Sequence, residues 1–307
     1  MAIPSVAIIG AGLMGHGIAL AFALAGRDVA LYEPDPEKYY ELPGRLRQSL
    51  RLMEADEATA DRVALHSSLE QAVGAADLVI EAVPEDIDLK RETFAAIEAA
   101  APAHALLASN TSVIPITRIM EGLRNPTRAM GTHWWNPPHL IPLVEVVQGQ
   151  DTGDDAVAGM MAALRDIGKV PVHVRKDVPG FIGNRLQHAM WREAIALVQE
   201  DVCDAETIDT VVKASFGRRL AVLGPLENAD LVGTDLTLQV HGYLLPHLDR
   251  SPQPLSLLRD LVAAGRLGMG SGAGFRAWSA AEADKVRADL ARHLRAFPSV
   301  ESQNQPP

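Results

Sequence analysis

The chain has 307 residues, enough for one large or two medium domains, and its 48% hydrophobic and 22% charged residues are typical of a soluble globular protein. A formal net charge of −11 argues against nucleic acid or an anionic membrane as the main partner. One cysteine, Cys203, excludes an internal disulfide and, with no Cys/His cluster, a structural zinc site. No signal-peptide pattern and no uncharged apolar segment of about 18 residues is present, so we expect a cytoplasmic protein.

The first strong motif is a glycine turn between an apolar strand and an apolar helix. Residues 6–9 predict a strand buried on both faces and residues 18–25 a helix, joined by the sequence GAGLMG. In a dinucleotide-binding fold, Gly10 permits the tight turn and Gly12 lets the backbone approach a pyrophosphate. Gly15 lets helix and strand pack closely, and the N-terminus of the helix faces the anion.

An acid at the end of the next strand indicates which nucleotide binds. Glu33 follows a strand expected at residues 29–32 and lies about 20 residues after Gly12, the spacing of a ribose-binding acid. The Glu33 carboxylate can accept hydrogen bonds from both ribose hydroxyls. No arginine follows Glu33 that could bind the 2′-phosphate of NADP. The sequence therefore predicts NAD and not NADP as cofactor, with Leu13 and Met14 of the glycine turn lining the site.

Strands and helices continue to alternate up to residue 174, as in a doubly wound sheet. Further strands are expected at residues 76–83, 105–108, 129–132 and 170–174, and helical segments at residues 38–64, 89–99 and 154–167. Residues 38–64 are charged and predict either a solvated helical surface or a phosphate-binding surface. Polar residues follow two strand ends, namely Glu85 and the turn Ser109–Ser112, and ligands bind at that end of open α/β sheets.

Residues 132–147, with the sequence THWWNPPHLIPLVEVV, carry the candidate catalytic pair. Pro137 and Pro138 prevent a helix from running through this stretch. A chain that doubles back here would lay the carboxylate of Glu145 against the imidazole of His133. Such a pair keeps one ring nitrogen protonated and raises the basicity of the other, as a general base requires. The alternative is a surface histidine and a buried glutamate satisfied by the backbone.

The pattern changes after a linker rich in proline and glycine at residues 175–180. From there on the apolar residues recur with helical spacing, and helices are expected at residues 184–199, 205–216, 231–248, 255–264 and 281–296. We therefore predict a Rossmann-type α/β domain with a doubly wound, mainly parallel sheet at residues 1–178. An all-α domain for substrate binding and dimerisation would follow at residues 179–307.

Taken together, these motifs resemble the 3-hydroxyacyl-CoA dehydrogenase superfamily, and the resemblance covers nearly the whole chain. It rests on five pieces in the expected order, which are Gly10–Gly15, Ala82–Lys90, Ser109–Ser112, His133–Glu145 and the sequence DVPGFIGNR of Asp177–Arg185. Each piece is short, but five in order make the resemblance highly specific.

The resemblance implies a catalytic role for each matching residue. His133 would be the general base that takes the proton of a secondary alcohol as hydride leaves for NAD, and Glu145 would hold and polarise it. Ser112 and Asn184 would hydrogen-bond the reacting oxygen or the substrate carbonyl. Asn136 would help to hold the loop that follows His133.

The remaining implied contacts concern the cofactor and the assembly. Glu85 and Lys90 would touch the nicotinamide side of NAD. The position of Asn110 in the polar turn at residues 109–112 allows, apart from the resemblance, either a cap of the next helix or a contact to the nicotinamide ribose or a substrate oxygen. The resemblance implies no metal. It also implies a homodimer formed through the helical domain, for which two-fold symmetry is expected.

Two departures from the acyl-CoA enzymes leave the substrate open. Trp134 and Trp135 replace the family's aromatic pair, and the following NPPHLIP resembles the λ-crystallin and L-gulonate 3-dehydrogenase branch. The segment that grips CoA in the acyl-CoA enzymes is shorter here and turns acidic, although Arg45, Arg47 and Arg51 could replace its lysines. The expected substrate is a 3-hydroxyacyl-CoA. The alternatives are a free hydroxy acid, such as a sugar acid or a hydroxymethyl aromatic acid, and a non-catalytic NAD-binding protein.

Overall fold

The computed structural model describes residues 5–296, which divide between two compact units. One unit contains the chain up to Asn184 together with the segment that begins at Leu290, and the other is Arg185–Asp289. Residues 1–4 and 297–307, which the sequence assigns to the Rossmann and helical domains, lie outside the described residues.

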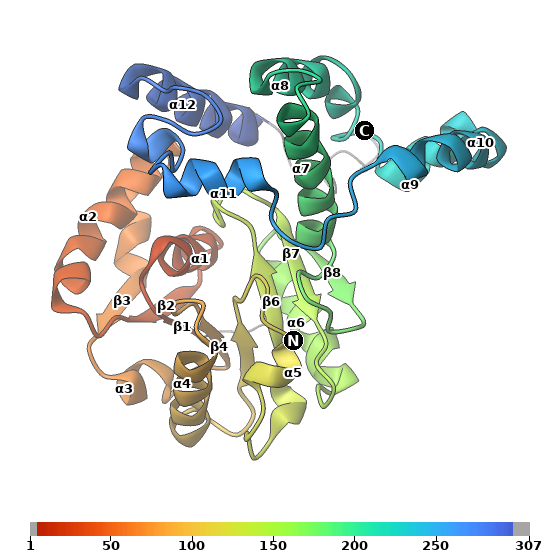
Figure 1. Cartoon of the computed structure of the whole chain (residues 1–307). Coiled ribbons are helices and arrows are strands. Elements are labelled where there is room, and N and C mark those ends of the chain that lie inside the picture. Colours follow the sequence, from red (N-terminus) through yellow and green to blue (C-terminus); the bar gives the residue numbers. More distant parts are fainter. Residues whose placement is uncertain (1–4, 297–307) are drawn as a thin grey trace, which may run out of the picture. The chain divides into compact units, whose positions relative to one another are not determined.

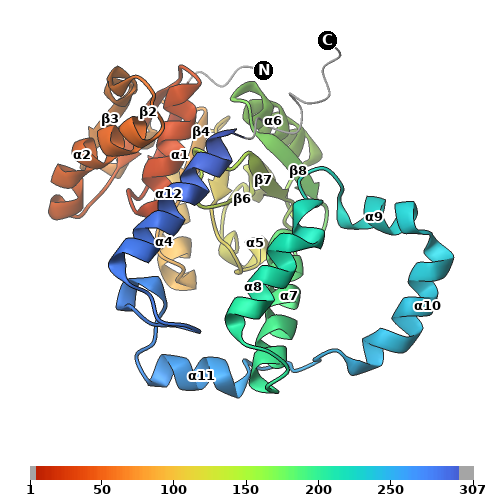
Figure 2. The ribbon, with the colours of Figure 1, turned by 90° about the horizontal axis from the view of Figure 1, so that it is seen from above.

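The described residues of the first unit form an eight-stranded sheet in the order β3-β2-β1-β4-β5-β6-β7-β8. The strands are β1 (Ser5–Ile9), β2 (Asp28–Tyr32), β3 (Val63–His66), β4 (Leu78–Glu81), β5 (Leu106–Ser109), β6 (Ala129–Trp134), β7 (Leu143–Val147) and β8 (Val170–Val174). Neighbouring strands are parallel except for β6 and β7, which are antiparallel. Figure 2 shows the strands following one another from β3 to β8. This sheet confirms the predicted Rossmann-type fold.

Helices cover both faces of the sheet. They are α1 (Leu13–Leu24), α2 (Pro36–Leu52), α3 (Leu69–Val73), α4 (Ile87–Ala100), α5 (Ile116–Ile119) and α6 (Asp154–Asp166), with short 3₁₀ helices at Glu57–Arg62 and Pro126–Arg128. One apolar core joins the sheet to α1, α2 and α6, and a second joins it to α3, α4 and α5. Figure 1 shows α1 and α2 on one side of the first strands and α3 and α4 on the other. Because both faces are covered, β1 and β4 read as continuous apolar runs.

The second unit is helical. Its elements are α7 (Gly183–Gln199), α8 (Ala205–Ala214), α9 (Pro225–Val232), α10 (Thr234–Leu244), α11 (Ser256–Ala263) and α12 (Ala280–Ala296), of which α7 and α12 run on into the first unit, and 3₁₀ helices at Phe216–Arg218, Leu245–His247 and Met269–Ser271. Figures 1 and 2 both show α9 and α10 projecting away from α7 and α8. Within residues 5–296, none of the helices is both long and apolar enough to cross a membrane.

Two segments differ from the sequence-based expectation. Residues 38–64 were expected to be helical throughout, but their end pairs with β2 as the short edge strand β3. A single helix was expected at residues 231–248, but Gly233, with φ +107°, separates α9 from α10. Glycine adopts this conformation without the steric cost that a side chain would meet, so the chain turns there.

The glycine turn supplies a test of the packing between β1 and α1. A Cβ on Gly15 would lie 1.8 Å from the carbonyl oxygen of Gly10, and that backbone is held by the sheet. We predict that Gly15→Ala lowers the free energy of unfolding by about 3 kcal/mol, the upper part of the range for overpacking. Urea denaturation followed by circular dichroism measures the change.

Gly44→Ala is the matched control for this substitution. Gly44 lies inside α2, and no atom lies within 4 Å of the position that its Cβ would take. Alanine there should raise the free energy of unfolding by about 0.5 kcal/mol, because alanine is the better helix former. Equal effects of the two substitutions would contradict this account of Gly15.

Candidate active site

The glycine turn presents open backbone at the start of α1. Gly12 is the N-cap residue of α1, no side chain caps the helix, and no atom lies within 4 Å of where a Cβ of Gly12 would be. Leu13 is exposed and Met14 is partly buried beside it. Gly10, with φ +99°, packs so closely on Ala82 that a Cβ would lie 2.9 Å from the Ala82 carbonyl oxygen. The first amides of α1 therefore face free space, as a bound pyrophosphate requires.

Glu33 braces this turn from the end of β2. Its Oε2 accepts a hydrogen bond from the backbone N–H of Ala11 at 2.9 Å, and its Oε1 accepts one from Asp35 N–H at 3.1 Å. Each carboxylate oxygen has a second acceptor site, so Glu33 can hold the turn and still accept ribose hydroxyls. The residues present therefore fit the adenosine half of NAD.

Arg45 and His16 support the turn from its other side, which the sequence did not predict. The guanidinium of Arg45 donates to the carbonyl oxygens of Ala11 at 3.1 Å and of Gly12 at 3.4 Å. The His16 ring lies 2.9 Å from the same Gly12 oxygen. Burial lowers the pKa of His16 despite that hydrogen bond, and the charge of Arg45 lowers the pKa further. Arg45 therefore supplies the positive charge at this turn.

The second half of the site is built on the antiparallel strands β6 and β7. Their register sets His133 directly opposite Glu145, and His133 Nδ1 lies 2.7 Å from Glu145 Oε2. Both side chains are buried, at 4% and 1% exposure. The chain thus doubles back and brings together the two residues that the sequence singled out.

The other oxygen of Glu145 is also engaged. Its Oε1 accepts hydrogen bonds from the backbone N–H groups of Ile182 at 2.9 Å and Gly183 at 3.0 Å. Burial alone would raise the pKa of Glu145, but the bonds from His133, Gly183 and Ile182 and the charge of His133 outweigh it and lower the pKa. Glu145 is therefore an ionised carboxylate, which can only accept hydrogen bonds and cannot donate one. His133 Nδ1 must then carry a hydrogen, and Nε2 is the nitrogen left to accept a proton.

Aromatic rings enclose the imidazole. The ring centres of Trp135 and Phe181 lie 5.3 Å and 5.6 Å from that of His133. Trp135 also packs on Gly183, where a Cβ would lie 2.4 Å from its ring carbon Cζ2. The rings fix the orientation of His133 by contact. Phe181 was not among the predicted site residues, because nothing in the linker sequence shows that it folds back to β6.

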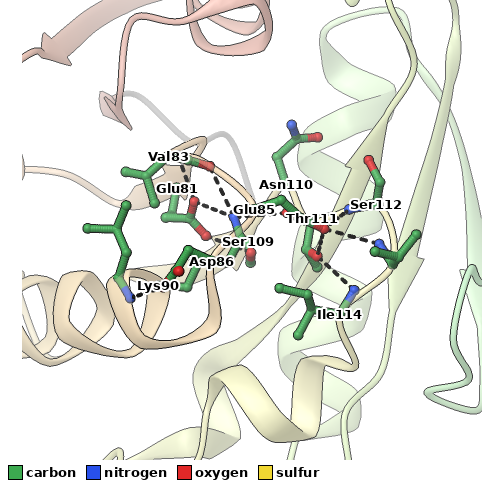
Figure 3. A network of polar contacts seen from close by, with 12 residues as sticks. Glu81, Val83, Glu85, Asp86, Lys90, Ser109, Asn110, Thr111, Ser112 and Ile114 are labelled. Carbon is green, nitrogen blue, oxygen red and sulfur yellow. Dashed lines mark hydrogen bonds and ion pairs between the residues drawn. The ribbon is translucent and has the colours of Figure 1, made fainter. Parts of the chain in front are cut away.

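Glu85 organises the polar turn that follows β5, as Figure 3 shows. Its Oε1 accepts hydrogen bonds from the Thr111 hydroxyl and from the backbone N–H groups of Ser112 at 2.9 Å and Val113 at 3.2 Å. The amide of Asn184 donates to the Ser112 carbonyl oxygen at 3.1 Å. Three predicted site residues, Glu85, Ser112 and Asn184, are thereby linked.

Lys90 reaches from α4 into the loop that follows β4. Its side chain is fully buried, and its Nζ lies 2.8 Å from Glu81 Oε1, 3.2 Å from the Val83 carbonyl oxygen and 3.4 Å from Glu85 Oε2 (Figure 3). An amine enclosed in this way holds the loop after β4 through these oxygens. Its main partner Glu81 was missed, although a charged residue at the end of an apolar strand was a visible signal. Burial raises the pKa of Glu81 against the opposing effect of Lys90 and Ser109.

The two remaining asparagines lie on either side of β6. Asn110 is buried, and its Oδ1 accepts a hydrogen bond from the backbone N–H of Trp134, the neighbour of His133, at 3.0 Å. Asn136 is exposed on the connection between β6 and β7, before a cis peptide bond to Pro137. Asn110 thus supports the strand that carries His133. In the described part of the chain, no cluster of three His, Cys, Asp or Glu side chains could hold a metal ion.

Comparison with known proteins identifies the family of this site. Residues 5–178 match the NAD-binding domain of 3-hydroxyacyl-CoA dehydrogenase, and residues 180–278 match the C-terminal domain of 3-hydroxyacyl-CoA dehydrogenase. The chain is 35% identical to the 5-formyl-3-hydroxy-2-methylpyridine 4-carboxylate 5-dehydrogenase of Mesorhizobium japonicum, over 95% of this chain and 96% of that protein. It is 38% identical to a probable 3-hydroxybutyryl-CoA dehydrogenase of Bacillus subtilis, over 90% of this chain and 97% of that protein.

A solved structure of the same family resembles this chain over nearly its whole length. The crystal structure of a 5-formyl-3-hydroxy-2-methylpyridine 4-carboxylic acid 5-dehydrogenase, described as an NAD⁺-dependent dismutase, superposes with a TM-score of 0.89 at 34% identity. The match covers 96% of this chain and 97% of that one. The glycine turn, Glu33 and the matched domains agree on the cofactor and the reaction class. This chain belongs to the 3-hydroxyacyl-CoA dehydrogenase family and is an NAD-dependent dehydrogenase that acts on hydroxyl groups.

Proposed function

We propose that His133 is the general base of the reaction, held by Glu145. The supporting observation is the 2.7 Å contact from Nδ1 to Glu145, which leaves Nε2 as the proton acceptor. In the oxidative direction Nε2 takes the proton of the substrate hydroxyl, and in the reductive direction it returns the proton to the carbonyl oxygen. NAD held by the glycine turn and Glu33 would supply the hydride acceptor for oxidation and, as NADH, the hydride donor for reduction.

We further propose that Ser112 and Asn184 orient the substrate oxygen. The Ser112 backbone is fixed by Glu85 on one side and by the Asn184 amide on the other. A hydroxyl on a turn held from two sides is preorganised for an oxygen that changes from alcohol to carbonyl. Lys90 would help to hold the Ser112 turn through its ion pair with Glu85, 3.4 Å away, and not by direct contact with the cofactor.

For the substrate we propose a free hydroxy acid that carries no CoA. The arginines that could have gripped CoA are engaged elsewhere, since Arg45 holds the glycine turn while Arg47 and Arg51 pair with Asp61 and Glu57 at 3.4 Å and 2.9 Å. The similarity to the pyridine carboxylate dehydrogenase spans nearly the whole of both chains and supports a hydroxymethyl or formyl aromatic acid. A 3-hydroxyacyl-CoA is the second candidate, favoured by the Bacillus subtilis relative.

A substrate comparison tests these assignments. The purified protein is assayed by NADH absorbance, with NAD⁺ for the alcohols L-gulonate and free 3-hydroxybutyrate, with NADH for acetoacetyl-CoA, and with each cofactor in turn for 5-formyl-3-hydroxy-2-methylpyridine-4-carboxylate. We predict that one of the free acids is turned over with a kcat/KM at least about tenfold above that for acetoacetyl-CoA, because no cationic grip for CoA is in place. Turnover of acetoacetyl-CoA alone would reject the free acid and leave the chemistry intact.

The role of His133 is tested with the same assay. His133→Ala should lower kcat by about 10²–10⁴-fold, the range for a lost general base, while NADH binding measured by fluorescence stays unchanged. His104→Ala is the matched control, because His104 is an exposed histidine that pairs with Asp77 away from the site. A variant of His133 with wild-type turnover would show that another group moves the proton.

We also propose that the protein is a homodimer formed through the helical unit. The helices α9 and α10 expose large apolar side chains, among them Leu226 at 79% and Leu238 at 74%. Single exposed apolar residues are ordinary, but a pair of helices with several of them is typical of an interface.

Light scattering with size-exclusion chromatography tests the dimer. We predict a mass of twice 32.9 kDa at micromolar concentration, and a shift to the single-chain mass in the double variant Leu226→Glu/Leu238→Glu. Tyr40→Glu is the control, because Tyr40 is equally exposed but lies on α2. A wild-type protein with the mass of one chain would disprove the proposal.

A further inference from the structure

Lys169 is a buried charge that the reaction does not use. It immediately precedes β8 and is only 6% exposed. Its Nζ donates to the carbonyl oxygens of Pro138 at 2.6 Å and Ile141 at 2.9 Å, and it lies 5.5 Å from the centre of the Trp134 ring. These partners are two carbonyl dipoles and an aromatic face, so hydrogen bonds and a cation–π contact hold the ammonium.

Both carbonyls belong to the connection between β6 and β7, residues 135–142, whose ends lead to His133 and Glu145. Its prolines, at positions 137, 138 and 142, have no N–H to donate. The connection makes one turn of its own, in which Leu140 and Ile141 N–H bond the Pro137 carbonyl oxygen at 3.0 Å and 2.9 Å. Lys169 therefore supplies donors that the connection itself lacks.

Holding an ammonium here is unfavourable by itself. Burial lowers the pKa of Lys169 to about 8. The neighbouring His139 adds no second positive charge, because burial and the charges of His16 and Lys169 lower its pKa to about 4 and leave its ring neutral near pH 7. A methionine would fill the same space without desolvating a charge, and such exchanges are often neutral for stability. Only the lysine, and not a methionine, can donate hydrogen bonds to the carbonyl oxygens of the connection.

We propose that Lys169 is a positioning residue that fixes the connection after His133 and so holds Trp135 and Asn136 at the substrate side of the imidazole. Trp135 transmits the constraint, because its ring lies 5.3 Å from the His133 ring and packs on Gly183. A connection released from Lys169 frees Trp135 to move, and His133 loses the ring that orients it. This inference rests on His133 as the base.

Two variants and a control test it. Lys169→Met removes the ammonium and both of its hydrogen bonds and is one atom shorter, and Lys169→Arg keeps a charged donor group. Lys176→Met is the control, because Lys176 is an exposed lysine that follows β8. We predict that Lys169→Met lowers kcat/KM about tenfold, the scale of a small misplacement of a catalytic group, and that Lys169→Arg recovers most of the loss. NADH affinity should stay within about twofold in all three variants, because the glycine turn is untouched.

Amide hydrogen exchange separates positioning from a loss of folding. Residues 139–141 should exchange faster in Lys169→Met, while the strands β1 and β4 keep their protection. This readout does not depend on turnover, so it distinguishes a failure of this inference from a failure of His133 as the base. Wild-type kcat/KM, or unchanged exchange at residues 139–141, would overturn the proposal. If the methionine variant does not fold, Lys169→Gln is scored by the same two measurements.

Discussion

The site depends on one cross-strand pair. In a sheet that is otherwise parallel between neighbours, β6 and β7 are antiparallel, and only an antiparallel pair joined by a short connection can place residues 133 and 145 directly opposite each other. The side chains of an opposite pair meet on one face, so the imidazole and the carboxylate are in contact as soon as the strands have paired. The geometry of the proposed catalytic pair is therefore part of the sheet and not of a loop.

Carboxylates hold the polypeptide around this pair. Glu33 accepts a hydrogen bond from a backbone N–H group of the glycine turn. Glu85 accepts hydrogen bonds from the turn after β5, and Glu145 accepts them from the start of α7. A carboxylate suits this task, because its two oxygens can accept several donors that irregular backbone leaves unpaired. The glycine turn, the turn after β5 and the proposed base His133 are thus each fixed by a glutamate. Two buried amines, Lys90 and Lys169, fix the adjoining loops by donating to oxygens.

Much of the fold was predictable because its signals are local. Apolar runs marked β1 and β4, and the glycine turn with Glu33 marked the nucleotide site. The short strand β3 was missed because it has four residues and follows a charged segment, so only its pairing with β2 defines it. Gly233 breaks a periodic helix through its backbone conformation, which residue spacing does not encode.

The site was predictable to a different extent. The prolines between His133 and Glu145 excluded a continuous helix and left a chain that doubles back as one of two interpretations, and the structure brings the two side chains together. The burial of Lys90 did not follow from the sequence, because its partner Glu81 lies on another element and a lysine in an amphipathic helix is usually exposed. Lys169 and Phe181 were missed for the same reason, since their partners on and around β6 are set by tertiary packing alone.

The central claim is that Glu145 fixes the proton of His133 on Nδ1 and leaves Nε2 to accept. A long-range ¹H–¹⁵N NMR spectrum of the protein near neutral pH, with the His133 signals assigned by comparison with His133→Ala, reads this directly. The account predicts a protonated Nδ1 and an unprotonated Nε2 in the wild type, and loss of that preference in Glu145→Gln. A proton on Nε2 with Nδ1 unprotonated would contradict it, because the Glu145 carboxylate would then face a ring nitrogen that has no hydrogen to donate.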